Sequence, residues 1–169
     1  MKQILSALLS LTMLLTLAAC GGQPAKVDSP QQEGVDLKGF YEDFLADMSH
    51  RNGPDHVPQM VEMDQKVLDA YLPGISSLDL KQCVAFTTAI SGVAFEFDLV
   101  EAKTSEDAAK AAEVLQARID YQVKDGAWYP ATVEVWEQAQ VVTHGSYAGL
   151  IAAGPEQENA VAAFNALFA

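Results

Sequence analysis

Two acidic side chains on one predicted strand could do chemistry together. Glu96 and Asp98 lie two positions apart in a run that alternates apolar and polar residues. A strand would place both carboxylates on one face, about 7 Å apart, a separation at which a carboxylate pair can serve a glycoside hydrolase. The chain holds 23 acidic residues, so we interpret the pair as surface acids. In the alternative, Glu96 lies on a helix-covered face and pairs with Arg118.

The other constellations for catalysis or metal binding are weaker. Residues 144–149 (HGSYAG) resemble a nucleophile elbow, but that motif needs serine where Tyr147 stands, so a glycine-flanked hairpin turn is predicted. His50, Asp55 and His56 lie in or beside one loop without the fixed support of a zinc site, so we predict solvated side chains and no metal. The sequence contains no glycine-rich phosphate motif, and no cofactor is predicted.

The N-terminal residues predict a covalent lipid attachment. Residues 1–19 combine the positive charge of Lys2 with a long uncharged apolar run, which is typical of an export signal. The run ends in Leu17-Ala18-Ala19-Cys20, which resembles the bacterial lipobox. In that motif the cysteine sulfur receives a diacylglyceryl group and the cysteine becomes the new N-terminus. We therefore predict attachment to a membrane by lipid on Cys20; the alternatives are a plain anchor helix or an ordinary signal peptide.

The second cysteine has no partner in the predicted mature chain. Acylation of Cys20 leaves only Cys83, so no disulfide can form within the chain. Cys83 lies in an apolar, strand-like run, and the neighbouring residues offer no base that would activate a thiol. We predict a buried structural thiol.

Aromatic residues gather in the second half of the chain: Tyr121, Trp128, Tyr129, Trp136 and Tyr147. For the group as a whole we favour a role in the core, because Tyr129 and Trp136 are spaced to fit a covering helix. Trp128 and Tyr129 come just before a proline, where a loop is predicted. If they are exposed there, they form a binding patch.

Length and charge limit the classes of protein. The 169 residues suffice for one globular domain and are too few for a two-lobed solute-binding protein or a barrel enzyme. The formal net charge of −13 disfavours binding of nucleic acid, which needs a basic surface. Residues 20–36 have the composition of a flexible tether. We predict a signal peptide over 1–19, a tether over 20–36 and a single domain over 37–169.

Hydrophobic periodicity divides this domain into helices and strands. Helices are predicted over 37–49, 61–71, 104–125, 130–138 and from 155 onward, and strands over 83–89, 92–101, 141–144 and 147–153. Ser91-Gly92 and Gly145 predict tight hairpin turns, and the strand over 92–101 is predicted to be half-buried. The order predicts an α+β fold: an antiparallel sheet of about four strands, in two ββα-like halves, with helices packed on one face, plus N-terminal helices.

Several short motifs in this domain resemble a known family. They are Ser91-Gly92-x-Ala94-x-Glu96-Phe97, Arg118 near the end of the long helix, Tyr129-x-x-x-Val133, Val141-Val142 and Gly145-x-Tyr147. Together with the lipobox and tether, they resemble the uncharacterised clostridial-type bacterial lipoprotein family catalogued as domain of unknown function 4358, over about residues 63–153. The chain departs from that family in its extra first helix and its many alanines. The resemblance implies placement on the outer face of the cytoplasmic membrane and implies no catalytic residues.

Two functions are compatible with these features. The first is a lipid-anchored, non-catalytic binding or adaptor module at the cell envelope. It would contact the membrane through the lipid on Cys20 and present an acidic surface to a basic protein, a cation or a cell-wall component. The second is a small extracytoplasmic hydrolase, which requires a cleft where Glu96, Asp98 or His144 are in contact. We expect the first, because the sequence shows no complete catalytic constellation.

Overall fold

The computed structural model describes residues 34–169. The predicted signal peptide, the lipobox with Cys20 and most of the predicted tether lie outside these residues. The described elements are α1 (Leu37–Asn52), β1 (Met60–Glu62), α2 (Gln65–Tyr71), β2 (Leu80–Thr88), β3 (Glu96–Ala102), α3 (Ser105–Tyr121), α4 (Pro130–Gln138), β4 (Gln140–His144), β5 (Tyr147–Ala152) and α5 (Gln157–Ala166). In this part of the chain no helix combines the length and the apolar character that crossing a bilayer requires.

The strands form one antiparallel sheet in the order β1-β2-β3-β5-β4. The predicted α+β class and antiparallel sheet are confirmed, and β1 adds a fifth strand. Val61, predicted to begin a helix, lies in β1. The helix starts later because the Asp64 side chain accepts a hydrogen bond from the Val67 amide and so caps α2.

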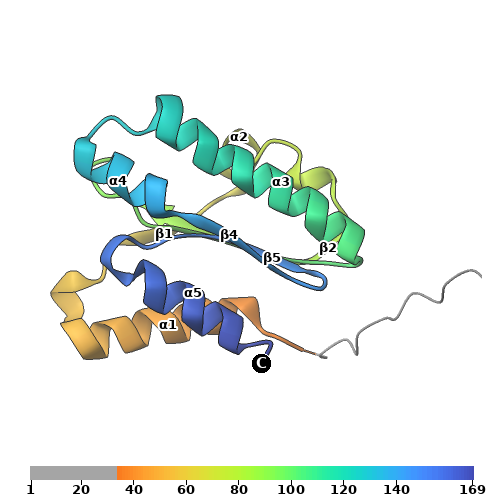
Figure 1. Ribbon diagram of the computed structural model, residues 1–169, viewed down its shortest axis with the longest axis horizontal. Helices are drawn as coiled ribbons and strands as arrows, with labels where there is room; N and C mark the ends of the chain where they lie inside the picture. The colour runs from red at the N-terminus through yellow and green to blue at the C-terminus, as the bar shows by residue number, and fades with distance from the viewer. Residues whose placement is uncertain (1–33) are drawn as a thin grey trace, which may run out of the picture.

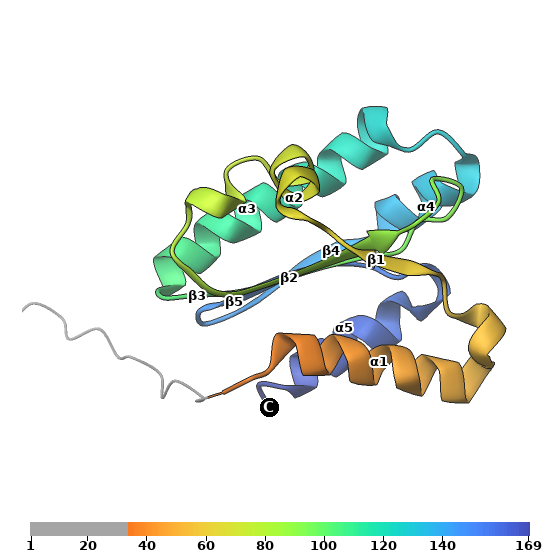
Figure 2. The ribbon, with the colours of Figure 1, turned by 180° about the vertical axis from the view of Figure 1, so that it is seen from behind.

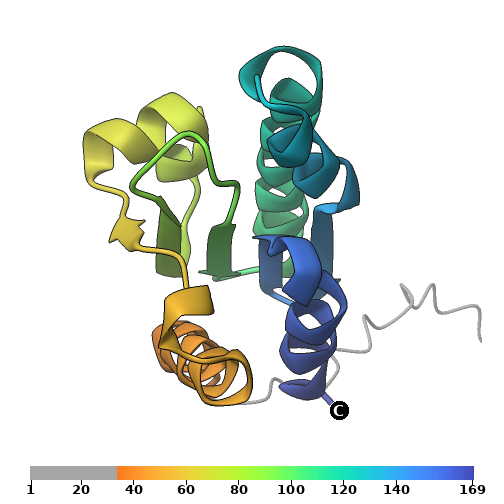
Figure 3. The ribbon, with the colours of Figure 1, turned by 90° about the vertical axis from the view of Figure 1, so that its left-hand side faces the viewer.

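Helices cover both faces of the sheet, where the sequence predicted helices on one face. Figures 1 and 2 show α1 and α5 on one face and α2, α3 and α4 on the other, and Figure 3 shows the sheet between these two layers. The central strand β3 explains the difference, because all seven of its residues are buried. The prediction that this strand is half-buried is wrong: its polar face is covered as well as its apolar face.

Two hydrophobic cores result. One lies between the sheet and the α1–α5 layer and contains Phe40, Phe97, Leu99 and Phe164. The other lies between the sheet and α2, α3 and α4 and contains Val100, Leu115, Trp136 and Leu150. Each core buries apolar surface that would otherwise contact water, which is the main stabilising contribution to the fold.

A buried carboxylate ties the α1–α5 layer together. Glu156 accepts a hydrogen bond from Asn52 Nδ2 at 2.7 Å and pairs with Arg51 Nη2 at 2.9 Å, so the end of α1 is fixed beside the start of α5. Pro155, predicted to open the last helix, lies instead in a short 3-10 turn, Gly154–Glu156, that precedes α5.

The loop between β2 and β3 is wider than the sequence predicted. Residues 89–95 form a wide loop where a tight turn was predicted, because the Thr88 hydroxyl donates to the carbonyls of Ile90 and Val93 and closes the wider bend.

The long helix α3 ends in a π-turn, Gln122–Gly126. Pro130 then begins α4 at its first position, where a missing amide proton costs nothing. Residues 127–129 are left as an irregular bridge between α3 and α4.

Cys83 lies on β2 and is exposed, so the prediction of a buried thiol is wrong. Within the described residues, the three-residue β1 pairs only with Phe86–Thr88 at the far end of β2. The half of β2 that carries Cys83 is therefore less covered than an interior strand.

Candidate binding site

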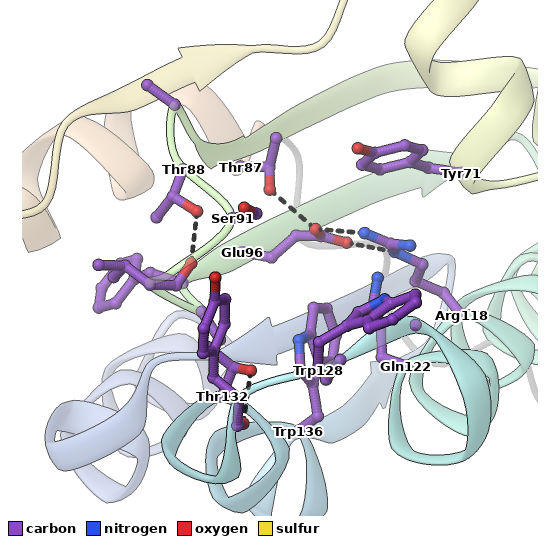
Figure 4. Close-up of a pocket in the computed structure, with 17 residues that line it drawn as sticks. Tyr71, Thr87, Thr88, Ser91, Glu96, Arg118, Gln122, Trp128, Thr132 and Trp136 are labelled. Atoms are coloured by element: carbon purple, nitrogen blue, oxygen red, sulfur yellow. Dashed lines mark hydrogen bonds and ion pairs between the residues drawn. The ribbon is translucent and has the colours of Figure 1, made fainter.

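A cavity of about 720 Å³ opens between the loop 89–95 and the bridge 127–129. We call it the Trp128 cavity. Its seventeen lining residues come from the end of α2, from β2 and the loop after it, from the start of β3, and from the segment that runs from the end of α3 into α4. Figure 4 shows the side chains that converge there. The volume falls within the range of about 300–1,000 Å³ that is usual for small-molecule sites.

A buried ion pair forms the floor of the Trp128 cavity. Arg118 Nε donates to Glu96 Oε1 at 2.8 Å and Nη2 donates to Oε2 at 2.9 Å, while the Thr87 hydroxyl donates to Oε2 at 3.0 Å. Glu96 is only 1% exposed. The interpretation of Glu96 as a surface acid is wrong, and the alternative of a pair with Arg118 on a helix-covered face is confirmed.

Aromatic rings hold the guanidinium of Arg118 in place. Its central carbon lies 4.0 Å from the ring centroid of Tyr71 and 5.3 Å from that of Trp136. In the view of Figure 4 it lies between Tyr71 above and the tryptophans below. Cation–π contacts of this kind add to the bidentate pairing, which by itself fixes the plane of the guanidinium. The ion pair at the floor is therefore held by contacts on several sides.

Asp98 lies beside this ion pair on the same face of β3 and is also buried, at 1% exposure, so its interpretation as a surface acid is wrong. Neither of its carboxylate oxygens has a hydrogen-bond partner within residues 34–169. Burial raises the pKa of Asp98 well above its usual value, the negative charge of Glu96 raises it further, and Arg118 opposes the rise. The fold therefore favours the neutral form of this carboxyl group.

This pKa shift makes stability depend on pH. Because the pKa of Asp98 is higher in the folded than in the unfolded chain, its contribution to stability is full at acidic pH and is lost as pH rises through the folded value. We expect Asp98→Asn to gain stability relative to wild type between pH 5 and pH 8, measured by urea denaturation. Asp43→Asn, on the exposed side of α1, is the control and should track wild type. An Asp98→Asn curve parallel to wild type would contradict the assignment.

The mouth of the Trp128 cavity carries exposed aromatic side chains. Trp128 is 87% exposed and Tyr129 is 56% exposed, and both line the cavity. The core role that we favoured for the aromatic group holds for Trp136 and Tyr147, which are buried, and fails for Tyr121, Trp128 and Tyr129, which are exposed. Tyr121 is as exposed as Tyr129 but is not among the residues that line the cavity.

Sequence reasoning missed Tyr71, Thr87 and Gln122 as cavity residues. One signal pointed to the site: Arg118 stands three positions after Leu115 on the buried stripe of α3, where an apolar residue is expected. A charged residue on such a stripe is almost never buried unless it is paired, so it calls for a buried partner.

The structure does not bring His144 to the two carboxyl groups. Its Nε2 lies 2.7 Å from Asn165 Oδ1, and its ring stacks on Phe168 beside α5. This is the opposite side of the sheet from Glu96 and Asp98. His50 and His56 are exposed, and within residues 34–169 no group of three or more histidine, cysteine or acidic side chains is placed to hold a metal ion.

A second cavity of about 440 Å³ adjoins the first. The two share the lining residues Val93, Ala94, Phe95 and Thr132. The loop 89–95 therefore borders both spaces.

Comparison with known proteins gives one match. No curated protein and no solved structure matches the chain. A family model described as "Domain of unknown function (DUF4358)" matches residues 55–153, which span the whole sheet and α2, α3 and α4. The match includes every residue that lines the Trp128 cavity and leaves α1 and α5 outside it. Because it covers more than half of the chain, this protein belongs to the DUF4358 family.

Proposed function

We propose that this protein is a lipid-anchored, extracytoplasmic, non-catalytic binding module at the cell envelope, and that the Trp128 cavity is its ligand site. The lipobox at Leu17-Ala18-Ala19-Cys20 supports the anchor. The observation that carries the binding role is Trp128 itself, 87% exposed at the mouth of a cavity with a polar floor. An exposed tryptophan beside a preformed cavity is typical of a recognition site.

The chemistry of the floor supports binding over catalysis. Both oxygens of Glu96 already accept hydrogen bonds, from Arg118 and Thr87, so the carboxylate is engaged as a structural acceptor. A general acid or base must reach the reacting group of its substrate. Asp98, the neighbouring carboxyl group, is buried and is not among the residues that line the cavity.

The anchor and the binding role can be tested together in cells fed labelled palmitate. We expect wild type to incorporate the label and Cys20→Ser to incorporate none. The labelled full chain, extracted in detergent, is then mixed with purified sacculi, the insoluble cell-wall polymer, and centrifuged. We expect it to sediment with the sacculi. Tyr129→Ala should stay largely in the supernatant, whereas Tyr121→Ala, which removes an equally exposed ring outside the cavity, should sediment like wild type.

Three results would count against this function. Equal labelling of wild type and Cys20→Ser would contradict the proposed lipid anchor. Absence of the wild-type chain from the pellet, or equal loss of binding in Tyr129→Ala and Tyr121→Ala, would remove the Trp128 cavity as the site of envelope binding.

A further inference from the structure

We propose that the Trp128 cavity binds a neutral glycan chain, with sugar rings stacked on Trp128 and Tyr129 and hydroxyl groups bonded to the polar residues below. This inference rests on the proposed function and names the class of its ligand. It draws on three properties of the cavity: its aromatic faces, its unused hydrogen-bonding groups and its balance of charge.

The aromatic faces suit a ring with an apolar side. Trp128 and Tyr129 are adjacent in the chain, and Tyr129 precedes Pro130, which restricts its backbone to an extended conformation. Both rings are large, amphipathic and exposed at the mouth. The C–H groups of a pyranose form such an apolar side, and the negative face of an aromatic ring attracts them. Stacking of this kind leaves the hydroxyl groups of the sugar free around its edge.

Polar groups are available to meet those hydroxyl groups. The side chains of Ser91, Gln122 and Trp128 line the cavity, and Figure 4 shows no hydrogen bond from any of them to another lining residue. They include groups that donate and groups that accept. A sugar hydroxyl does both, so it complements such a mixed set. A purely apolar ligand would leave these groups without partners, which costs binding energy.

The charge of the cavity disfavours ionic ligands. Of its described lining residues, Arg118 is the one cation and Glu96 the one carboxylate, and they neutralise each other. An anion would compete with Glu96 for Arg118, and a cation would compete with Arg118 for Glu96. The formal net charge of −13 repels polyanions further. A neutral, polar ligand with an apolar ring face remains as the best match, and the sugars of a glycan chain have these properties.

The intrinsic fluorescence of the protein reports on this site directly. The chain has two tryptophans, Trp128 and Trp136, and both line the Trp128 cavity. We would titrate the detergent-solubilised full chain with a tetrasaccharide of β-linked N-acetylglucosamine, a neutral glycan probe, and measure tryptophan emission and heat of binding. Sorbitol, an acyclic polyol without a ring face, is the control ligand.

We expect the tetrasaccharide to shift tryptophan emission to the blue and sorbitol to leave it unchanged. Calorimetry should show binding that weakens on the order of ten-fold in Trp128→Ala, while Tyr121→Ala binds like wild type. No response to the tetrasaccharide, from a chain that still sediments with sacculi, would overturn the glycan inference and leave the envelope-binding function standing. Binding of a free wall stem peptide in place of the tetrasaccharide, or an equal response to sorbitol, would also overturn it. Failure with both tetrasaccharide and sacculi would overturn the inference and the function together.

Discussion

Replacing Arg118 by methionine is expected to lower the free energy of unfolding by roughly 3–5 kcal/mol. The substitution removes the two Arg118 donors to the Glu96 carboxylate and leaves that charge buried with only the Thr87 hydroxyl as a donor. Methionine keeps most of the side-chain length, so the loss comes chiefly from the uncompensated charge rather than from an empty space. Urea denaturation of the full chain at neutral pH measures the change.

The double variant Glu96→Leu with Arg118→Met separates charge from packing. Because it removes both ions, it should recover most of the stability that Arg118→Met loses. Lys110→Met is the control on the same helix: its ion pairs with Glu106 and Asp107 are at the surface, so little change is expected. An Arg118→Met variant as stable as wild type, or a double variant no better than the single one, would show that the pair does not act as described.

Phe164→Ala is expected to lower the free energy of unfolding by about 3–5 kcal/mol, because it removes a fully buried ring that joins α5 to the rest of the core. The ring lies edge-on to Phe40 of α1, with 5.6 Å between centroids. It also packs against β5 at Gly149, where an added Cβ would lie 2.9 Å from Leu99 Cδ2 and 3.4 Å from Phe164 Cζ. That strand position has room for the ring only because it lacks a side chain.

Thermal unfolding of Phe164→Ala beside Phe168→Ala provides the measurement. Phe168 is only partly buried, so its loss should lower the melting temperature much less. The two variants also test whether the family domain depends on helices outside it. The helices α1 and α5 lie outside the matched residues 55–153 and yet cover one face of its sheet. Equal effects of the two substitutions would mean that α5 is peripheral to the fold.

Local sequence patterns predicted most of the elements, because caps, prolines and periodicity act over a few residues. Thr104 caps α3 where the sequence placed its start, and Pro130 begins α4. Patterns could not reveal which sheet face would be covered. The alternation in β3 correctly separates Glu96 from Phe97, but burial of the polar side depends on Tyr71 and Arg118, which come from helices elsewhere in the chain. These contacts join residues that are far apart in the chain, so patterns over a few residues do not predict them.

Local patterns also indicated only part of the candidate site. Trp128 and Tyr129 could be singled out because a proline follows them and large aromatic residues in a loop are unusual. The wide loop 89–95 could not be predicted, because a glycine after serine is typical of a tight turn. The hydrogen bonds of Thr88 that widen the loop depend on the folded geometry. The cavity exists because these two segments meet, and neither segment alone predicts the other.

The direction of α1 determines which end of the domain would face the membrane attachment. This helix has 16 residues, so its ends are about 24 Å apart. The predicted tether precedes its first residue, which lies at the end of the described chain where the C-terminus also lies. The last residues of α1 border the second cavity and so lie toward the proposed ligand site. If Cys20 is acylated as proposed, the lipid joins the domain at the end remote from the Trp128 cavity. The attachment would therefore leave the mouth of the cavity free to meet polymer that is fixed in place and cannot diffuse to the membrane.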